Sequence, residues 1–200
     1  LANGGKLTLN NLKIVDKSVS YAEDSWEYGY LEFGGVIRLE ECDVVNAIMF
    51  SGETAAFKSC SFNSHEDNQY AVWVDNGSAY FTDCTFKGAR GLKTHEDYGS
   101  EVAKITVDGC TFDNLTKKPG MAIGTVNEET AITIKNSFFF GCQPGDQGLY
   151  LYETDTDITT FTFVLDNNEV HANPSAMVKE WVANAQTGDV VEIPAGEYTF

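Results

Sequence analysis

An eight-residue pattern recurs along this chain and constrains its fold more than any other feature. The pattern is apolar, any, apolar, any, any, cysteine, any, apolar, and it reads IRLEECDV, AAFKSCSF, AYFTDCTF and ITVDGCTF from positions 37, 55, 79 and 105. Three further copies without the cysteine, LTLNNLKI, ITIKNSFF and FVLDNNEV, begin at positions 7, 132 and 163. Seven copies at intervals of 18 to 31 residues indicate a solenoid, in which each turn packs on its neighbours.

The spacing of apolar residues within one copy predicts two short strands joined by a corner. Side chains alternate along a strand, so positions 1 and 3 share a face, whereas positions 6 and 8 have the opposite parity. The chain must therefore bend between positions 3 and 6 if all four side chains are to point inward. Position 5 is rich in Asn, Asp and Gly, the residues that best tolerate the left-handed backbone of a sharp corner. Its seven residues are Asn11, Glu41, Ser59, Asp83, Gly109, Asn136 and Asn167.

A second apolar segment follows the pattern in most copies, at 30–33, 47–50, 71–74, 91–94, 121–124 and 149–152. Each turn of chain thus carries three strand-like faces. Stacking such turns about 4.8 Å apart gives an all-β fold, a right-handed, single-stranded parallel β-helix of about seven rungs.

Four of the five cysteines occupy the same inward position in successive rungs. They belong to a ladder that other residues continue at both ends: Leu12, Cys42, Cys60, Cys84, Cys110, Ser137 and Asn168. Side chains about 4.8 Å apart and parallel suit buried free thiols, because disulfides need Cβ atoms about 3.8 Å apart on converging vectors. A disulfide or a metal site is the alternative to this interior wall. Cys142 lies outside the ladder and is the candidate for an exposed, reactive thiol.

The net charge of −17 restricts the partners of the chain. Such a surface repels phosphate backbones and anionic lipid headgroups, so we expect neither nucleic-acid binding nor membrane insertion. No apolar run approaches the length of a membrane span. Cations and neutral ligands such as glycans remain as expected partners. The opening LANGGKLTL reads as the middle of a longer chain, which predicts a processed or excised domain.

Three rungs carry a shared signature, SCSFN at 59–63, DCTFKG at 83–88 and GCTFDN at 109–114, and YAVWVDNG follows the first of them. They resemble the rungs of pectin-lyase-like right-handed β-helix repeat proteins, specifically cell-surface domains of gut bacteria, over roughly residues 5–170. The resemblance implies a secreted protein in an extracellular or cell-surface location. It says less about function, because that architecture hosts lyases, hydrolases, phage tailspikes and inert stalks alike.

The last 28 residues form a separate unit. We expect the β-helix to occupy residues 1–172, followed at 173–200 by a helix that begins near Pro174 or Ser175 and stops at Gly188, then a strand and a turn. This segment is similar to the helix that caps the start of a β-helix. It either opens a following module, or packs as a displaced cap that links molecules head to tail, or simply shields the last rung.

The outward residues of the second apolar segments form the candidate ligand-binding face. They read Glu32, Met49, Trp73, Lys93, Ala122 and Tyr150, with Tyr152 close by. Trp73 and Tyr150 could stack on sugar rings, and Lys93 and Tyr152 lie beside them, unless a long loop covers this face. Outward position 4 carries alternating charges instead, which predicts structural ion pairs for Glu40 with Lys58 and for Lys135 with Asp108 and Asp166.

Acidic residues gather at the corner after these segments. Glu153, Asp155 and Asp157 follow one another at every second position, and Glu128 lies one rung earlier. Their oxygens suit Ca²⁺, the one cofactor that the sequence suggests; the alternative is a solvated acidic edge. Two His-Glu-Asp triplets, 65–67 and 95–97, fall at different corners and are predicted to be solvated loops.

These features favour a non-catalytic, adhesin-like β-helix module of a bacterial surface protein that binds carbohydrate. No residue is singled out as catalytic. The alternative is a carbohydrate-active enzyme, a polysaccharide lyase or glycoside hydrolase, that would use the acidic corner. Glycosidase chemistry would need two carboxyl groups about 5.5 Å or about 6.5–9.5 Å apart across a cleft.

Overall fold

The computed structural model describes residues 5–15, 31–45, 48–64, 70–94, 102–113, 115, 120–123, 127–141, 149–151, 159–171, 174–193 and 198. Each copy of the repeat is a strand, a corner and a second strand, as predicted. The strands before the corners are β1 (Lys6–Asn10), β4 (Val36–Glu40), β6 (Ile48–Lys58), β8 (Tyr70–Thr82), β11 (Ala103–Asp108), β14 (Ala131–Lys135) and β17 (Thr162–Asp166). The strands after the corners are β2 (Lys13–Val15), β5 (Asp43–Val45), β7 (Ser61–Ser64), β9 (Thr85–Gly88), β12 (Thr111–Asp113), β15 (Phe138–Phe140) and β18 (Glu169–His171).

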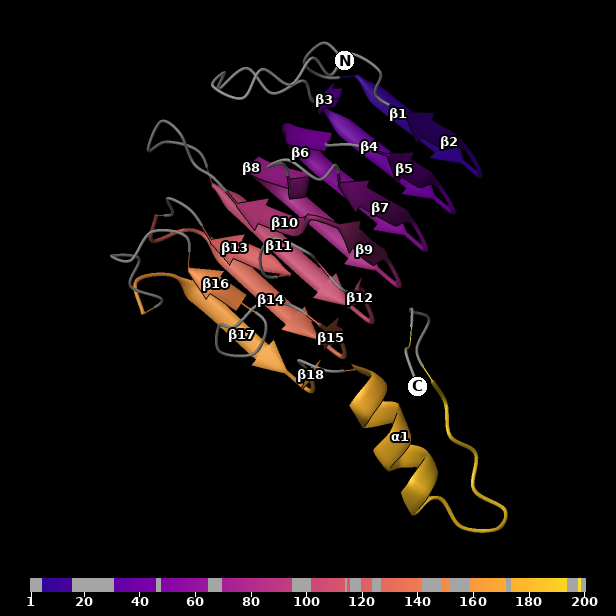
Figure 1. The fold of residues 1–200 in the computed structure, drawn as a ribbon. Coiled ribbons are helices and arrows are strands. Elements are labelled where there is room, and N and C mark those ends of the chain that lie inside the picture. Colours follow the sequence, from indigo (N-terminus) through magenta and orange to yellow (C-terminus); the bar gives the residue numbers. More distant parts are fainter. Residues whose placement is uncertain are drawn as a thin grey trace.

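The strands wind into a coil of parallel rungs (Figure 1). Strands after the corners form a seven-stranded sheet, in the order β18-β15-β12-β9-β7-β5-β2. Strands before the corners join the strands of the second apolar segments in an eleven-stranded sheet, called the wide sheet below. Each second apolar segment is the third strand-like face of its turn and is called a third segment. The third segments are the first parts of β6 and β8 together with β3 (Leu31–Phe33), β10 (Arg90–Thr94), β13 (Met121–Ile123) and β16 (Leu149–Leu151).

A stack of glycines lets one rung continue into the next. β6 and β8 each run from a third segment into the following repeat, with a register shift between Phe50 and Thr54. Gly77 has a φ of +86°, and a Cβ added there would collide with the carbonyl oxygen of Gly52. Gly52 in turn lies against Gly35 in the rung before. Only glycine allows backbones to approach this closely, so these residues set the bend of the wide sheet.

The seven predicted corners all adopt the left-handed backbone. Their φ angles lie between 51° and 64° at Asn11, Glu41, Ser59, Asp83, Gly109, Asn136 and Asn167. Side chains at the later corners also bond to one another. The Asn136 amide donates to the Asp108 carboxylate at 2.8 Å, and the Asn167 amide donates to the Asn136 carbonyl oxygen at 2.9 Å. Because Asp108 directly precedes the corner residue Gly109, these two bonds form a short hydrogen-bonded ladder along the last three corners of the coil.

The four ladder cysteines are free and buried, as predicted. Each thiol donates to the carbonyl oxygen two residues earlier, as Cys60 does to Lys58 at 3.3 Å. The thiols of Cys60, Cys84 and Cys110 also donate to a carbonyl of the preceding rung, as Cys84 does to Phe57 at 3.4 Å. Ser137 and Asn168 continue the ladder with stronger bonds of the same kind: Ser137 donates to Lys135 at 2.8 Å, and Asn168 donates to Ile134 at 2.9 Å. Position 6 thus supplies an additional donor to carbonyls beside the corner, such as that of Lys58, which also accepts from the Glu41 N–H at 3.0 Å.

Phenylalanines two residues after the cysteines stack along the interior. Adjacent rings have centroids 5.3, 4.6 and 4.5 Å apart and lie within 17° of parallel. The stack contains Phe62, Phe86, Phe112 and Phe139, all with at most 1% of their surface exposed. The recurring Cys-x-Phe motif therefore combines a corner donor with a core ring.

The two ends of the coil differ from its middle. Leu12 was predicted to continue the inward ladder, but 47% of its surface is exposed. Val170, at inward position 8 of the last rung, is likewise 40% exposed. Leu12 lies in the corner that precedes β2, and Val170 lies in β18. The strands β2 and β18 are the two end strands of the seven-stranded sheet. An inward side chain is covered only when rungs lie on both sides of it, which is why the prediction fails for Leu12.

The chain leaves the coil through α1 (Pro174–Asn184), in agreement with the predicted start of the helix. The helix ends four residues before Gly188, which has a φ of +101°. Residues 189–193 were predicted to form a strand, and the structure assigns none there. Val190 in this segment is largely exposed. A strand needs a partner edge, and β-propensity alone does not supply one. The part of the chain that the structure describes contains no helix suited to crossing a bilayer.

Candidate functional site

The outward residues of neighbouring third segments pair with one another in the register that the sequence predicts. Trp73 in β8 pairs with Met49 in β6 on one side and with Lys93 in β10 on the other. The column continues from Lys93 to Ala122 in β13, and from Ala122 to Tyr150 in β16. Because paired residues of parallel strands point the same way, these positions share one face of the wide sheet. Nothing further is described of the Tyr150 side chain.

Trp73 is held by an aromatic and cationic cluster. The Lys93 ammonium lies 4.2 Å from the centroid of the Trp73 ring and 5.9 Å from that of Tyr70. The Tyr70 and Trp73 rings meet edge to face with centroids 5.6 Å apart. The Arg90 guanidinium lies 5.4 Å from the centroid of the Tyr70 ring. Cations attracted to aromatic faces and an edge-to-face ring pair fix the orientation of the indole.

Burial separates the members of this cluster. Trp73 is half-buried, whereas Lys93 is only 4% exposed. We had expected Lys93 to lie on an open outer face, and its burial corrects that expectation. Its ammonium lies against the Trp73 and Tyr70 rings, and cation–π contacts of this kind offset the cost of burying a lysine. Trp73 is therefore the member of the pair with ring surface left for a ligand.

Two members of the cluster, Tyr70 and Arg90, were not singled out from the sequence. They pair in register at the starts of β8 and β10. The predicted strand at 71–74 begins one residue after Tyr70, so the alternation rule gave no reason to place Tyr70 on the outer face. The signal that could have found them is the equal offset of Tyr70 from Trp73 and of Arg90 from Lys93.

The predicted acidic corner is described only in part. Glu128 is exposed in the turn between β13 and β14, where the Thr130 N–H donates to the Asn127 carbonyl at 3.1 Å. Tyr152, Glu153, Asp155 and Asp157 lie outside the described residues, as do Cys142 and both His-Glu-Asp triplets. Among the residues that are described, no three His, Cys, Asp or Glu side chains converge as metal ligands. The calcium site stays a prediction.

The outward column at position 4 is structural, as expected. Lys58 pairs with Glu40 at 3.2 Å, and Lys135 pairs with Asp108 at 3.1 Å. The hydrogen bond from the Asn136 amide, and secondarily the Lys135 ammonium, lower the pKa of the Asp108 carboxyl from its usual value. These ion pairs join neighbouring rungs and leave the Trp73 face as the candidate site.

One comparison with known proteins bears on this fold. A family model for a right-handed beta helix region matches residues 46–180, more than half of the chain. The chain belongs to the right-handed β-helix family. No curated protein and no solved structure matches it. Family membership establishes the right-handed β-helix as the fold, but it assigns no activity, because this fold supports many functions.

At the C-terminal end of the β-helix, α1 packs on the outer side of the seven-stranded sheet. Met177 and Val178 are buried against Phe140 of β15, and Tyr198 packs on the same group. Burial, and secondarily the Asp113 carboxylate, raise the pKa of the Tyr198 phenol. The chain thus returns to the β-helix after the helix.

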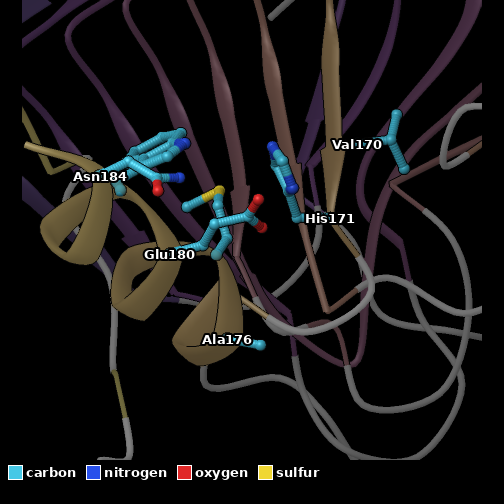
Figure 2. A pocket seen from close by; sticks show the side chains of 7 residues that line it. Val170, His171, Ala176, Glu180 and Asn184 are labelled. Atoms are coloured by element: carbon cyan, nitrogen blue, oxygen red, sulfur yellow. The ribbon is translucent and has the colours of Figure 1, made fainter.

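An open groove separates α1 from β18. It is lined by Val170, His171, Ala176, Met177, Glu180, Trp181 and Asn184. Figure 2 shows His171 on the strand and Glu180 on the helix extending into this space. The His171 and Trp181 rings meet edge to face with centroids 6.1 Å apart, and Nε2 of His171 lies 3.3 Å from the Glu169 carboxylate. The groove therefore has an aromatic wall beside the last strand of the β-helix.

Proposed function

We propose that this chain is a non-catalytic β-helix module of a bacterial surface protein, with an adhesin-like role, that binds a glycan at Trp73. The observation that carries the proposal is the half-buried Trp73 indole, braced by the Tyr70 ring and the Lys93 ammonium on the outer face of the wide sheet. An aromatic ring already fixed in place loses little conformational entropy when a sugar ring stacks on it.

Charge supports a carbohydrate over other ligand classes. The chain carries 30 acidic and 13 basic residues, so polyanions are repelled at a distance. A neutral sugar face experiences no such repulsion, and the apolar side of its ring matches an indole. The outer columns at position 4 support a non-catalytic role, because their charged groups neutralise one another between rungs.

The experiment is a glycan array followed by calorimetric titration of the strongest ligand. Trp73→Ala should weaken binding at least tenfold, because the stacking surface is lost. Tyr80→Ala is the matched control: Tyr80 is an exposed aromatic on the same strand, β8, but outside the cluster, so its removal should leave the affinity unchanged. Thermal melts of both variants establish that each is folded.

Three results would overturn the proposal. The first is a Trp73→Ala variant that is folded and binds glycan as tightly as the original chain. The second is an original chain that binds no glycan on the array. The third is turnover of a uronic-acid polymer that disappears when Glu153 and Asp155 are replaced by alanine, which would establish the carbohydrate-active enzyme instead.

A further inference from the structure

The first and last rungs that the structure describes each contain strands with a described partner on one side only. In the described part of the chain, β1 pairs only with β4 and β2 pairs only with β5. At the other end β17 pairs only with β14, and β18 only with β15. Backbone N–H and C=O groups along a free strand edge are a template for another strand.

The inward side chains of the end rungs are also incompletely covered. Leu7, Leu9 and Ile14 of the first rung, and Phe163 and Leu165 of the last, are half-buried. Their counterparts in the middle rungs have at most 2% of their surface exposed. Considering only the described residues, each end of the coil is therefore an apolar layer with a neighbouring rung on one side, and solenoids need such layers covered.

We propose that a second copy of this chain docks head to tail, with its first rung stacked on the last rung of the copy before it. Continuing the register of the repeat places Leu7 on Phe163, Leu9 on Leu165 and Ile14 on Val170. Each of these pairs matches one apolar residue with another at the same inward position. The new strand pairs, β1 on β17 and β2 on β18, would add a strand to each of the two sheets.

The corner ladder fits the same junction. Along the coil, asparagine amides donate toward the preceding rung: Asn167 donates to the corner residue Asn136, and Asn136 donates to Asp108, which precedes the corner residue Gly109. Asn11 occupies the corner of the first rung with a φ of 51°. Stacked on the last rung, its amide would donate to the carbonyl oxygen of Asn167. An asparagine at each end lets the ladder continue from one copy into the next.

Charge at the junction is complementary in this direction. Lys13 is the outward residue at position 7 of the first rung, and Glu169 holds the same position in the last. Within the chain, Lys13 reaches the equivalent residue of the next rung, Asp43, at 3.7 Å. A second copy would thus place a lysine beside Glu169 in a geometry that the chain already uses. Pairing of like ends would instead bring equal charges together.

The groove beside α1 accommodates the incoming strand. Val15 of β2 is 43% exposed, and in the junction it would lie next to His171, where the groove between β18 and α1 opens (Figure 2). Trp181 lines the groove and contacts His171. The exposed side chain of Val15 would thus be covered by the aromatic rings of His171 and Trp181 at the edge of the last rung. The helix would flank the junction.

Charge reversal tests this arrangement by sedimentation velocity at low ionic strength. The original chain should show a sedimentation coefficient that rises with concentration. Lys13→Glu and Glu169→Lys should each weaken association at least tenfold, because each alone places like charges at the junction. An equimolar mixture of the two variants should associate again, since every junction between unlike copies regains an opposite pair.

The matched control is Lys87→Glu, the same substitution at an exposed position in the middle of the coil, which should associate like the original chain. Residues 13 and 169 lie in the first and last rungs, so recovery in the mixture cannot arise within one molecule. The proposal is overturned if the original chain stays monomeric at every concentration. It is equally overturned if the mixture remains as dissociated as its components while both are folded.

Discussion

Phe112 and Phe139 stack in the interior with ring centroids 4.5 Å apart and planes 4° from parallel. They come from consecutive rungs separated along the chain by 27 residues, as their paired positions in β12 and β15 show. The ring contact repeats the spacing of the strands themselves, so side chains and backbone stabilise the same stack.

Removing one ring should interrupt this stack. Phe112→Ala is expected to lower the free energy of unfolding by about 3–5 kcal/mol, because Phe112 is fully buried between Phe86 and Phe139. Urea denaturation monitored by circular dichroism measures the change. Tyr80→Ala, which removes an exposed ring, should cost far less. Similar losses for the two variants would contradict the interior placement of Phe112.

The glycine stack predicts a second large effect. Gly77→Ala should destabilise the chain by about 2–4 kcal/mol, since the new Cβ meets the Gly52 carbonyl in addition to the strain of a positive φ. Gly188→Ala isolates the strain, because Gly188 also has a positive φ but no atom near its added Cβ. Its cost should stay near 1 kcal/mol in the same denaturation experiment. Equal costs would show that the close approach is absent.

Glu41 is the corner residue least suited to its backbone, whose φ is 53°. Asparagine tolerates this conformation better, so Glu41→Asn should raise the free energy of unfolding by about 0.5–1 kcal/mol. The same exchange at Glu53, which has no positive φ, should have little effect. A melting temperature that falls for Glu41→Asn would count against a strained corner.

The ladder thiols should resist alkylation in the folded chain. Hydrogen bonding with Cys110, together with burial, raises the pKa of the Cys84 thiol to about 12, and the hydrogen bond with Cys84, together with burial, raises that of Cys60. Thiolates are the reactive species, and all four thiols are also buried, so iodoacetamide at pH 8 should leave Cys42, Cys60, Cys84 and Cys110 unmodified. Peptide mass mapping before and after denaturation checks this. Rapid labelling of Cys84 in the native chain would contradict the interior ladder.

Asp108 gives the stability a small dependence on pH. Its pKa is lowered in the folded chain, so its contribution is present above the unfolded pKa of about 3.9 and is lost as the pH falls through the folded value. Because the carboxylate is partly exposed, Asp108→Asn should cost at most about 1 kcal/mol at pH 7. The difference between the two proteins should vanish as Asp108 becomes protonated. A difference that persists in strong acid would point to another cause.

Periodicity explains which parts of the fold the sequence predicts well. Glu41 and Ser59 are poor corner residues by composition, yet their position in the repeat placed them correctly at positive φ. Trp73 and Lys93 were likewise assigned to one column because strand register follows from the repeat. Repetition supplies long-range information that a single strand lacks.

The failures concern residues whose surroundings the repeat does not determine. Leu12 fits the inward pattern but is exposed, since burial depends on a rung on each side. Residues 189–193 have strand-forming side chains but no strand, because no pairing edge follows from composition. The burial of Lys93 depends on how Tyr70 and its neighbours pack, which alternation along one strand does not reveal.

The donors at position 6 have a consequence for how such a chain can change in length. Cys84 donates to carbonyls in its own turn and in the turn before, Ser137 donates to one in its own turn, and Asn168 donates to one in the turn before, so successive layers offer similar acceptors to whatever follows them. A gene segment that encodes one whole turn could be duplicated or deleted, and the new neighbours would still find matching partners. The hydrogen bonds made at one side-chain position therefore allow the β-helix to become longer by duplication of whole turns.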